Sequence, residues 1–314
     1  MREIGEEKMG GEAIEEGVLK GEFMEAEGGE AVRRREGSVE KEGEVPDSVV
    51  ANGAGFGVEG FDDEDRWVTF KSLERAPESH HHYNEGHQEF SRIFHQRVRK
   101  EWMILNKSLP DGILVRVFED RIDLLRVLMV GPEGTPYDHG LFLFDMSLPA
   151  EYPQQPPSVY FHSWTSGMGR LNPNLYEDGK ILVSIQGLVL VRNPYFNEAG
   201  YERQVGTAEG AANSLLYNER TYLLNLKSIS HVILRPPDNF ADEVAFWFRD
   251  KEILKKVIQR AEEVLTRSEA DGGEGVEGEE GQFPVRKVSV GGVRLLRGNL
   301  EQLRRANDRL NGLA

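Results

Sequence analysis

The chain has 314 residues, a formal net charge of −16, 39% hydrophobic and 29% charged residues, and no cysteine. This length permits one large domain or two modest ones of roughly 100–200 residues each. The lack of cysteine excludes disulfides, thiolate metal sites and cysteine nucleophiles from the chain. The acidic balance argues against nucleic-acid binding, which needs a basic surface.

The acidic charge is concentrated at the beginning of the chain. Residues 1–65 hold 20 of the 54 acidic residues but only 7 of the 38 basic ones. This segment alternates glutamate and glycine and carries few large side chains, so it buries too little apolar surface to offset the entropy lost on ordering. We predict a disordered acidic arm. No signal peptide and no apolar run of about 20 residues is visible, so we expect an intracellular protein of the cytoplasm or nucleus without a membrane span.

Residues 66–267 have the pattern of an ordered core. A helix is predicted over 88–107 by apolar residues at helical spacing, namely Phe90, Ile93, Phe94, Val98, Trp102 and Leu105. Four runs rich in strand-forming residues follow, at 113–118, 123–130, 140–148 and 158–162, each bounded by turn residues. One helix followed by closely spaced strands predicts an antiparallel meander packed on that helix.

The second half of the chain has mainly helical patterns. Residues 221–232 and 240–267 are predicted helices, whereas the apolar run 181–191 fits either a helix or a strand. Residues 268–284 are rich in glycine and glutamate and predict a linker. In the segment 285–314, leucines at near-helical spacing predict an amphipathic helix that either packs weakly on the core or binds a partner. The predicted fold class is therefore α+β, with a four-stranded antiparallel meander.

Three isolated motifs have no expected chemical role. The side chains of His80, His81 and His82 diverge because they are adjacent, and no second cluster lies at ligand spacing, so we expect no metal site. Asp138 and His139 fall in a predicted hairpin turn, where solvated side chains are expected. Residues 167–169 (Gly-Met-Gly) lack the lysine and hydroxyl of a phosphate loop, and no cofactor is predicted.

A family resemblance is carried by several motifs in a fixed order. Residues 131–137 read Gly-Pro-Glu-Gly-Thr-Pro-Tyr, and they are followed by Gly140, Phe142, Phe144, Pro149, Tyr152, Pro153, Pro156 and Pro157. This run resembles the signature of the ubiquitin-conjugating enzyme core. Phe142 and Phe144 should alternate onto one sheet face, and the prolines should hold a surface loop rigid.

Further motifs resemble one branch of this family. Residues 172–176 (Asn-Pro-Asn-Leu-Tyr) resemble the family's His-Pro-Asn element, with asparagine in the first position. Together with 195–201 and 206–210, they are similar to the large conjugating enzymes that include the plant phosphate-homeostasis regulator and the animal hybrid of conjugating enzyme and ligase. The similarity covers about residues 66–267.

The resemblance implies thioester chemistry that this chain lacks. Family members carry ubiquitin on a cysteine, and a substrate lysine then attacks the thioester. Leu182 occupies the position that the motif count assigns to this cysteine, and the residues after Lys180 resemble a later helix of the family. The cysteine-bearing piece is therefore absent. Asn174 matches the family's oxyanion asparagine, and without a thioester it is expected only to brace its loop.

The resemblance also implies two surfaces for partner proteins. In the family the first helix contacts the activating enzyme, and ligases use this helix together with the proline-rich loop. The corresponding residues are Arg92, Arg97, Arg99 and Lys100 on the helix and Tyr152, Pro153, Pro156 and Pro157 in the loop. The expected partners are ubiquitin, activating enzyme, a ubiquitin ligase or a substrate protein, and the alternative is a solvated basic face.

Three functional hypotheses remain open from the sequence. The chain is a non-catalytic binding module that resembles a conjugating enzyme, or it is a truncated isoform or gene model of an active enzyme. A third alternative is an acidic scaffold whose core serves only as a folding platform.

Overall fold

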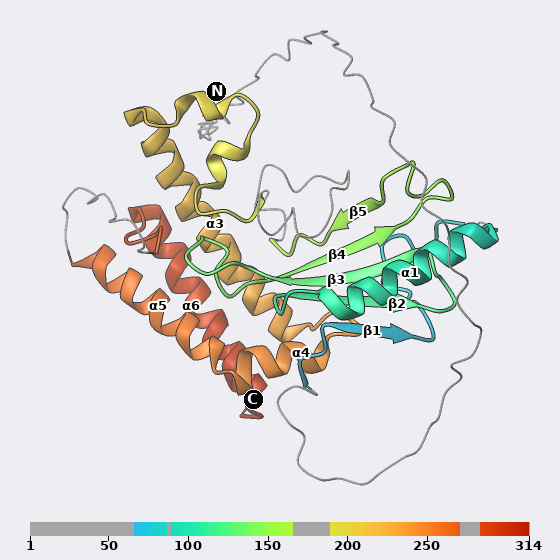
Figure 1. The fold of residues 1–314 in the computed structure, drawn as a ribbon. Helices are drawn as coiled ribbons and strands as arrows, with labels where there is room; N and C mark the ends of the chain where they lie inside the picture. The colour runs from blue at the N-terminus through green and yellow to red at the C-terminus, as the bar shows by residue number, and fades with distance from the viewer. Residues whose placement is uncertain (1–65, 87–88, 166–188, 271–282, 314) are drawn as a thin grey trace, which may run out of the picture. The chain divides into compact units, whose positions relative to one another are not determined.

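A five-stranded sheet is the centre of the computed structural model, which describes residues 66–86, 89–165, 189–270 and 283–313 (Figure 1). The strands are β1 (Phe70–Leu73), β2 (Ile113–Phe118), β3 (Leu124–Val130), β4 (Leu141–Ser147) and β5 (Ser158–Phe161). The α-helices are α1 (Arg92–Ser108), α3 (Ala208–Leu234), α4 (Ala241–Ala245), α5 (Ile253–Glu269) and α6 (Val290–Leu310). Short helical turns are η3 (Pro194–Asn197), η4 (Tyr201–Gln204) and η5 (Phe246–Asp250).

The predicted meander and the α+β class are confirmed. Strands β2 to β5 pair antiparallel in chain order. The structure adds β1, which pairs parallel to β2 with Phe70 opposite Val115. A run of four residues is too short to show a clear alternation, so the pattern did not reveal this strand.

One face of the sheet is apolar and packs against α1. The register places Phe70, Val115, Val127, Phe144 and Phe161 in a continuous row across all five strands. Val115, Val127 and Phe144 are buried in one hydrophobic cluster with Phe94 and Val98 of α1, and the half-buried Phe70 and Phe161 pack against it. The expectation that Phe142 and Phe144 share a face is confirmed, since both lie in this cluster.

The neighbouring row, on the opposite face, is polar, and its residues on β2, β3 and β4 are nonetheless buried. It contains Arg116, Arg126, Asp145 and Tyr160 in register on β2 to β5. The Arg126 guanidinium donates to both oxygens of Asp145, at 2.7 and 2.9 Å. Arg116 is paired with Glu243 of α4. Because both faces of these strands are covered, their sequences read as nearly continuous apolar runs.

The later helices differ from the prediction in their extent. Helix α3 begins at Ala208 rather than near Thr221, and the Thr207 side chain accepts a hydrogen bond from Gly210 N at 3.0 Å. Its first turns carry exposed Leu215 and Leu216, so they lack the apolar stripe that marks a packed helix. The predicted helix over 240–267 is interrupted, since η5 and a positive φ of 56° at Glu252 separate α4 from α5.

The C-terminal helix α6 is part of the main core, so the expectation of weak packing is wrong. Leu296, Leu300, Leu303 and Ala306 are buried in one cluster with residues of α3, α5 and the sheet. Figure 1 shows α6 beside α3 and α5. The expectation failed because leucine spacing predicts an amphipathic helix but does not show which surface receives it.

Several sequence expectations concern residues outside the described part of the chain. These are the arm 1–65, the motif 167–169 and most of the predicted linker, at 271–282. Within the described part, no helix has the length and hydropathy needed to cross a membrane.

Candidate functional site

Helix α1 presents a basic surface to solvent, as the sequence predicts. The Ser91 hydroxyl caps its first turn by accepting a hydrogen bond from Phe94 N at 3.1 Å. Phe94 and Val98 fix the buried side of the helix. The four predicted cations, Arg92, Arg97, Arg99 and Lys100, are all exposed, and none of them forms an ion pair with another described residue.

The same exposed surface carries apolar side chains that the sequence pattern did not predict there. Ile93 is 76% exposed, Met103 59% and Ile104 54%. Ile93 was predicted to lie on the buried face, and that prediction is wrong. Helical spacing places Ile93, Arg97, Lys100 and Ile104 along one line, which we call the α1 stripe.

The proline-rich loop between β4 and β5, residues 148–157, lies beside α1 and has its own backbone hydrogen bonds. Tyr152 N donates to Pro149 O at 2.9 Å, and Gln154 N donates to Glu151 O at 2.8 Å. Pro153 and Pro156 are exposed, and Pro157 is half-buried. Because proline fixes φ, this loop loses little conformational entropy when it contacts another surface.

A hydrogen bond joins the loop to α1. The Tyr152 hydroxyl donates to Oε2 of Glu101 at 2.6 Å, and the Tyr152 ring packs against the cluster beneath α1. Burial of the phenol, together with the Glu101 carboxylate, raises the pKa of Tyr152 to about 12, so the hydroxyl remains a donor at neutral pH. The two predicted partner-binding patches are therefore neighbours. Glu101 was missed by the sequence analysis, because no local pattern links it to a loop 51 residues later.

The two residues predicted for the lost catalytic site lie outside the described residues. They are Asn174 and Leu182, both within 166–188. The absence of a thiol is a property of the sequence itself, which has no cysteine.

The three consecutive histidines make separate contacts. His80 Nε2 lies 3.0 Å from Leu125 O, His82 Nδ1 lies 2.7 Å from Glu85 Oε1, and the His81 ring stacks on Tyr160 with centroids 3.6 Å apart. The contacts of His80 and His81 hold the segment 74–86 against the sheet, whereas the His82 contact lies within the segment. Across the described residues, no three His, Asp or Glu side chains are grouped so as to hold a metal ion.

Burial and hydrogen bonds set the charge states of His80 and of Asp145 in the polar row. Burial lowers the pKa of His80 to about 4, although the nearby Asp145 carboxylate favours its protonation. For Asp145, burial alone would raise the pKa, but hydrogen bonds from His162 and Arg126 outweigh it and hold the pKa well below its usual range. At neutral pH a neutral His80 therefore lies beside the ionised Asp145 of the row.

Asp138 and His139 are buried, so the expectation that they are solvated is wrong. Asp138 is paired with Arg260 of α5, and Asn225 of α3 donates to Asp138 O at 3.1 Å. Burial, ahead of all nearby charges, lowers the pKa of His139. The hairpin turn is thus covered by α3 and α5, which sequence periodicity alone did not place there.

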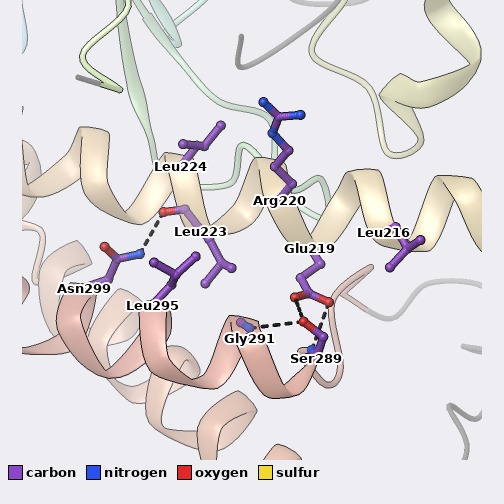
Figure 2. Close-up of a pocket in the computed structure, with 10 residues that line it drawn as sticks. Leu216, Glu219, Arg220, Leu223, Leu224, Ser289, Gly291, Leu295 and Asn299 are labelled. Carbon is purple, nitrogen blue, oxygen red and sulfur yellow. Dashed lines mark hydrogen bonds between the residues drawn. The ribbon is translucent and has the colours of Figure 1, made fainter. Parts of the chain in front are cut away.

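A groove of about 370 Å³ lies between α3 and α6 (Figure 2). Leu216 and Leu223 line one side and Leu295 the other. At its end the Glu219 carboxylate accepts hydrogen bonds from Ser289 N at 3.0 Å and Ser289 Oγ at 2.6 Å, which fixes the first turn of α6 to α3. The groove therefore lies along the contact between two packed helices, and the hydrogen bonds between Glu219 and Ser289 fix the position of one helix against the other.

Comparison with known proteins gives a family match in the central part of the chain. Residues 97–188 match the profile of the family described as "Ubiquitin-conjugating enzyme". This match contains the end of α1, strands β2 to β5 and the proline-rich loop.

Curated relatives carry the same description. The chain is 46% identical over 206 residues to "Probable ubiquitin-conjugating enzyme E2 23" of Arabidopsis thaliana, covering 57% of this chain and 18% of that protein. It is 40% identical over 208 residues to "Putative ubiquitin-conjugating enzyme E2 38" of the same plant, covering 56% and 63%. A human "Dual E2 ubiquitin-conjugating enzyme/E3 ubiquitin-protein ligase BIRC6" is 34% identical over 192 residues, covering 51% and 4%.

A Plasmodium vivax ubiquitin conjugating enzyme E2 is 27% identical, with 29% of this chain and 80% of that chain covered and a TM-score of 0.23. The chain spans less than two thirds of the length of the curated relatives named above. The family profile and the relatives agree with the ordered motifs, so the central part of this chain is similar to ubiquitin-conjugating enzymes.

Proposed function

We propose that this chain is a non-catalytic member of the ubiquitin pathway, which binds a partner protein through α1 and the proline-rich loop. The observation that carries the proposal is the exposed α1 stripe beside that loop, in a chain without cysteine. Ubiquitin transfer needs a thiolate to form the thioester, whereas partner binding needs only the surface.

The composition of the surface supports binding rather than simple solvation. Exposed Ile93 and Ile104 flank Arg97 and Lys100, so apolar area and positive charge lie together. Apolar contacts of this kind slow dissociation, while unpaired cations accelerate association with an acidic partner. The partners implied by the family are activating enzyme, a ubiquitin ligase, ubiquitin or a substrate protein.

The first experiment is a charging assay. With activating enzyme, ATP and ubiquitin, the chain should form no ubiquitin adduct that is cleaved by a thiol reductant, because it has no acceptor thiol. An active conjugating enzyme in a parallel reaction provides the control. A reductant-sensitive adduct on this chain would show that the non-catalytic proposal is wrong.

Binding itself is measured with two purified probes, activating enzyme and a panel of RING domains from ubiquitin ligases. We expect at least one probe to bind, and Ile104→Asp to weaken that binding at least fivefold because it places a charge in the apolar contact. Leu216→Asp is the matched control, because Leu216 is also an exposed aliphatic residue on a helix. It lies on α3, away from the proposed surface. Equal effects of the two changes, or no binding by any probe, would contradict the proposal.

The second candidate is a truncated isoform or gene model of an active enzyme. It is favoured by the order of motifs around Lys180, where the cysteine-bearing piece of the family is missing. Leu182→Cys restores a thiol at the assigned position, but we expect no charging, because the surrounding loop is also absent and displacements of about 1 Å can cost ~100-fold in such sites.

The matched variant inserts the complete family loop between Lys180 and Ile181. Charging by this variant alone would support the truncation hypothesis. Efficient charging by Leu182→Cys would instead show that only the nucleophile had been lost.

A further inference from the structure

The proposed partner surface consists of two elements that are far apart in sequence. Helix α1 contributes the exposed stripe, and the loop after β4 contributes Pro153 and Pro156. Two such patches bind one partner well only if their relative position is fixed before binding, since ordering them during binding costs affinity.

A side-chain hydrogen bond between described residues joins these patches. Glu101 is half-buried and lies one helical turn after Arg97, at the border between the α1 stripe and the buried face. Its Oε2 accepts the Tyr152 hydroxyl at 2.6 Å, and the residue that follows Tyr152 is the exposed Pro153. A hydrogen bond to an ionised acceptor in a half-buried place is stronger than one between neutral groups.

We infer that Glu101 is a positioning residue, which holds the proline-rich loop against α1 so that the two form one continuous docking surface. This inference rests on the proposed function and deepens it. The partner that fits this surface is a protein with an apolar contact area and acidic groups at its rim, because the surface combines exposed Ile104, prolines and exposed cations.

The position of the loop is measured without any partner. Because the chain has no cysteine, Gln96→Cys and Gln155→Cys provide two unique sites for nitroxide labels, both exposed and neither part of the hydrogen bond. We expect Glu101→Ala and Tyr152→Phe each to broaden the distance distribution between the labels. Glu151→Ala, which removes an exposed carboxylate from the same loop, should leave the distribution unchanged.

Affinity for the RING domain that binds most tightly is then measured in the same variants. Glu101→Ala and Tyr152→Phe should each weaken binding about fivefold, and the double variant should be no weaker than either single variant, because both remove the same interaction. Glu101→Gln retains an oxygen acceptor and should restore binding to within about twofold of the original chain. This rescue separates positioning from loss of packing.

The outcomes are distinguishable. Unchanged distance distributions in both single variants would overturn the inference, whatever the affinity for the RING domains. Broadened distributions with an unchanged affinity would overturn it as well. If no RING domain or activating enzyme binds the original chain while the variants broaden the distribution, the proposed function fails and the docking role of Glu101 fails with it, although the hydrogen bond still positions the loop.

Discussion

Single residues on the polar face of the sheet connect the N-terminal segment to the family core. His81 N donates to Asp145 Oδ2 at 2.8 Å, and the Arg126 guanidinium donates to the Ser79 hydroxyl at 3.0 Å. On the sheet, the acceptor Asp145 and the donor Arg126 form a buried ion pair with each other. A buried ion pair needs all its hydrogen-bonding positions filled, and the segment 74–86 supplies several of them.

The stability of the chain should depend on pH through His80. The pKa of His80 is about 4 in the folded chain and about 6.5 when unfolded, so its contribution to stability is complete above pH 6.5 and is lost as the pH falls toward 4. We expect this loss to be on the order of 2–3 kcal/mol in the free energy of unfolding. His80→Gln should make the loss of stability on acidification smaller by about this amount, and the remainder includes the contribution of His139, whose pKa burial also lowers.

The measurement is urea unfolding at intervals between pH 7 and pH 4. His95→Gln provides the control, because His95 is half-exposed on α1 and outside the polar row. Equal slopes for His80→Gln and the original chain in this window would show that His80 does not carry the effect. Asp145 has a lowered pKa, so its own contribution is lost at lower pH, as the pH falls below about 4.

Among the helices, α6 extends the folded core beyond the region predicted from the sequence. Its buried side packs against α3 and α5, and its first turn is capped by Ser289, whose hydroxyl accepts a hydrogen bond from Gly292 N at 3.1 Å. Asn299 donates to Leu223 O at 2.8 Å within this interface. The helix is thus joined to α3 by apolar and polar contacts together.

We therefore predict that α6 contributes strongly to stability. Leu303 is fully buried and Leu295 is 52% exposed on the same helix. Leu303→Ala should lower the free energy of unfolding by about 2–5 kcal/mol, because it leaves a cavity, whereas Leu295→Ala should change it by less than about 1 kcal/mol. Both are measured by urea unfolding, and similar effects of the two changes would mean that α6 is only loosely attached.

At the scale of the whole molecule, the sequence predicted the elements with strong local patterns. The four antiparallel strands, α1 and the amphipathic C-terminal helix are present, since alternation, helical spacing and turn residues are local properties. It did not predict strand β1, the burial of Asp138 and His139, or the packing of α6. Each of these depends on contacts between residues far apart in the chain, such as Asp138 with Arg260.

The candidate surface was predicted in its composition but not in its geometry. The motifs pointed to the basic residues of α1 and to the loop around Tyr152, and the structure shows them as neighbours. The exposed Ile93 and the acceptor Glu101 were missed, because an apolar residue at helical spacing is ordinarily assigned to the core and a single glutamate on a helix has no distinctive signal.

The parallel strand β1 has a consequence for the resistance of this chain to aggregation. An unpaired strand at the edge of a sheet offers free backbone groups to another chain and promotes aggregation. Here β1 covers the edge of β2, and β1 is itself only four residues long. Among the described residues, the strand at the opposite edge is β5, which has the same length. Residues 66–86 precede the family match at residue 97, yet they close the sheet and cover its buried charges. Protection of the β2 edge is therefore supplied by residues that precede the part of the chain matched by the family profile.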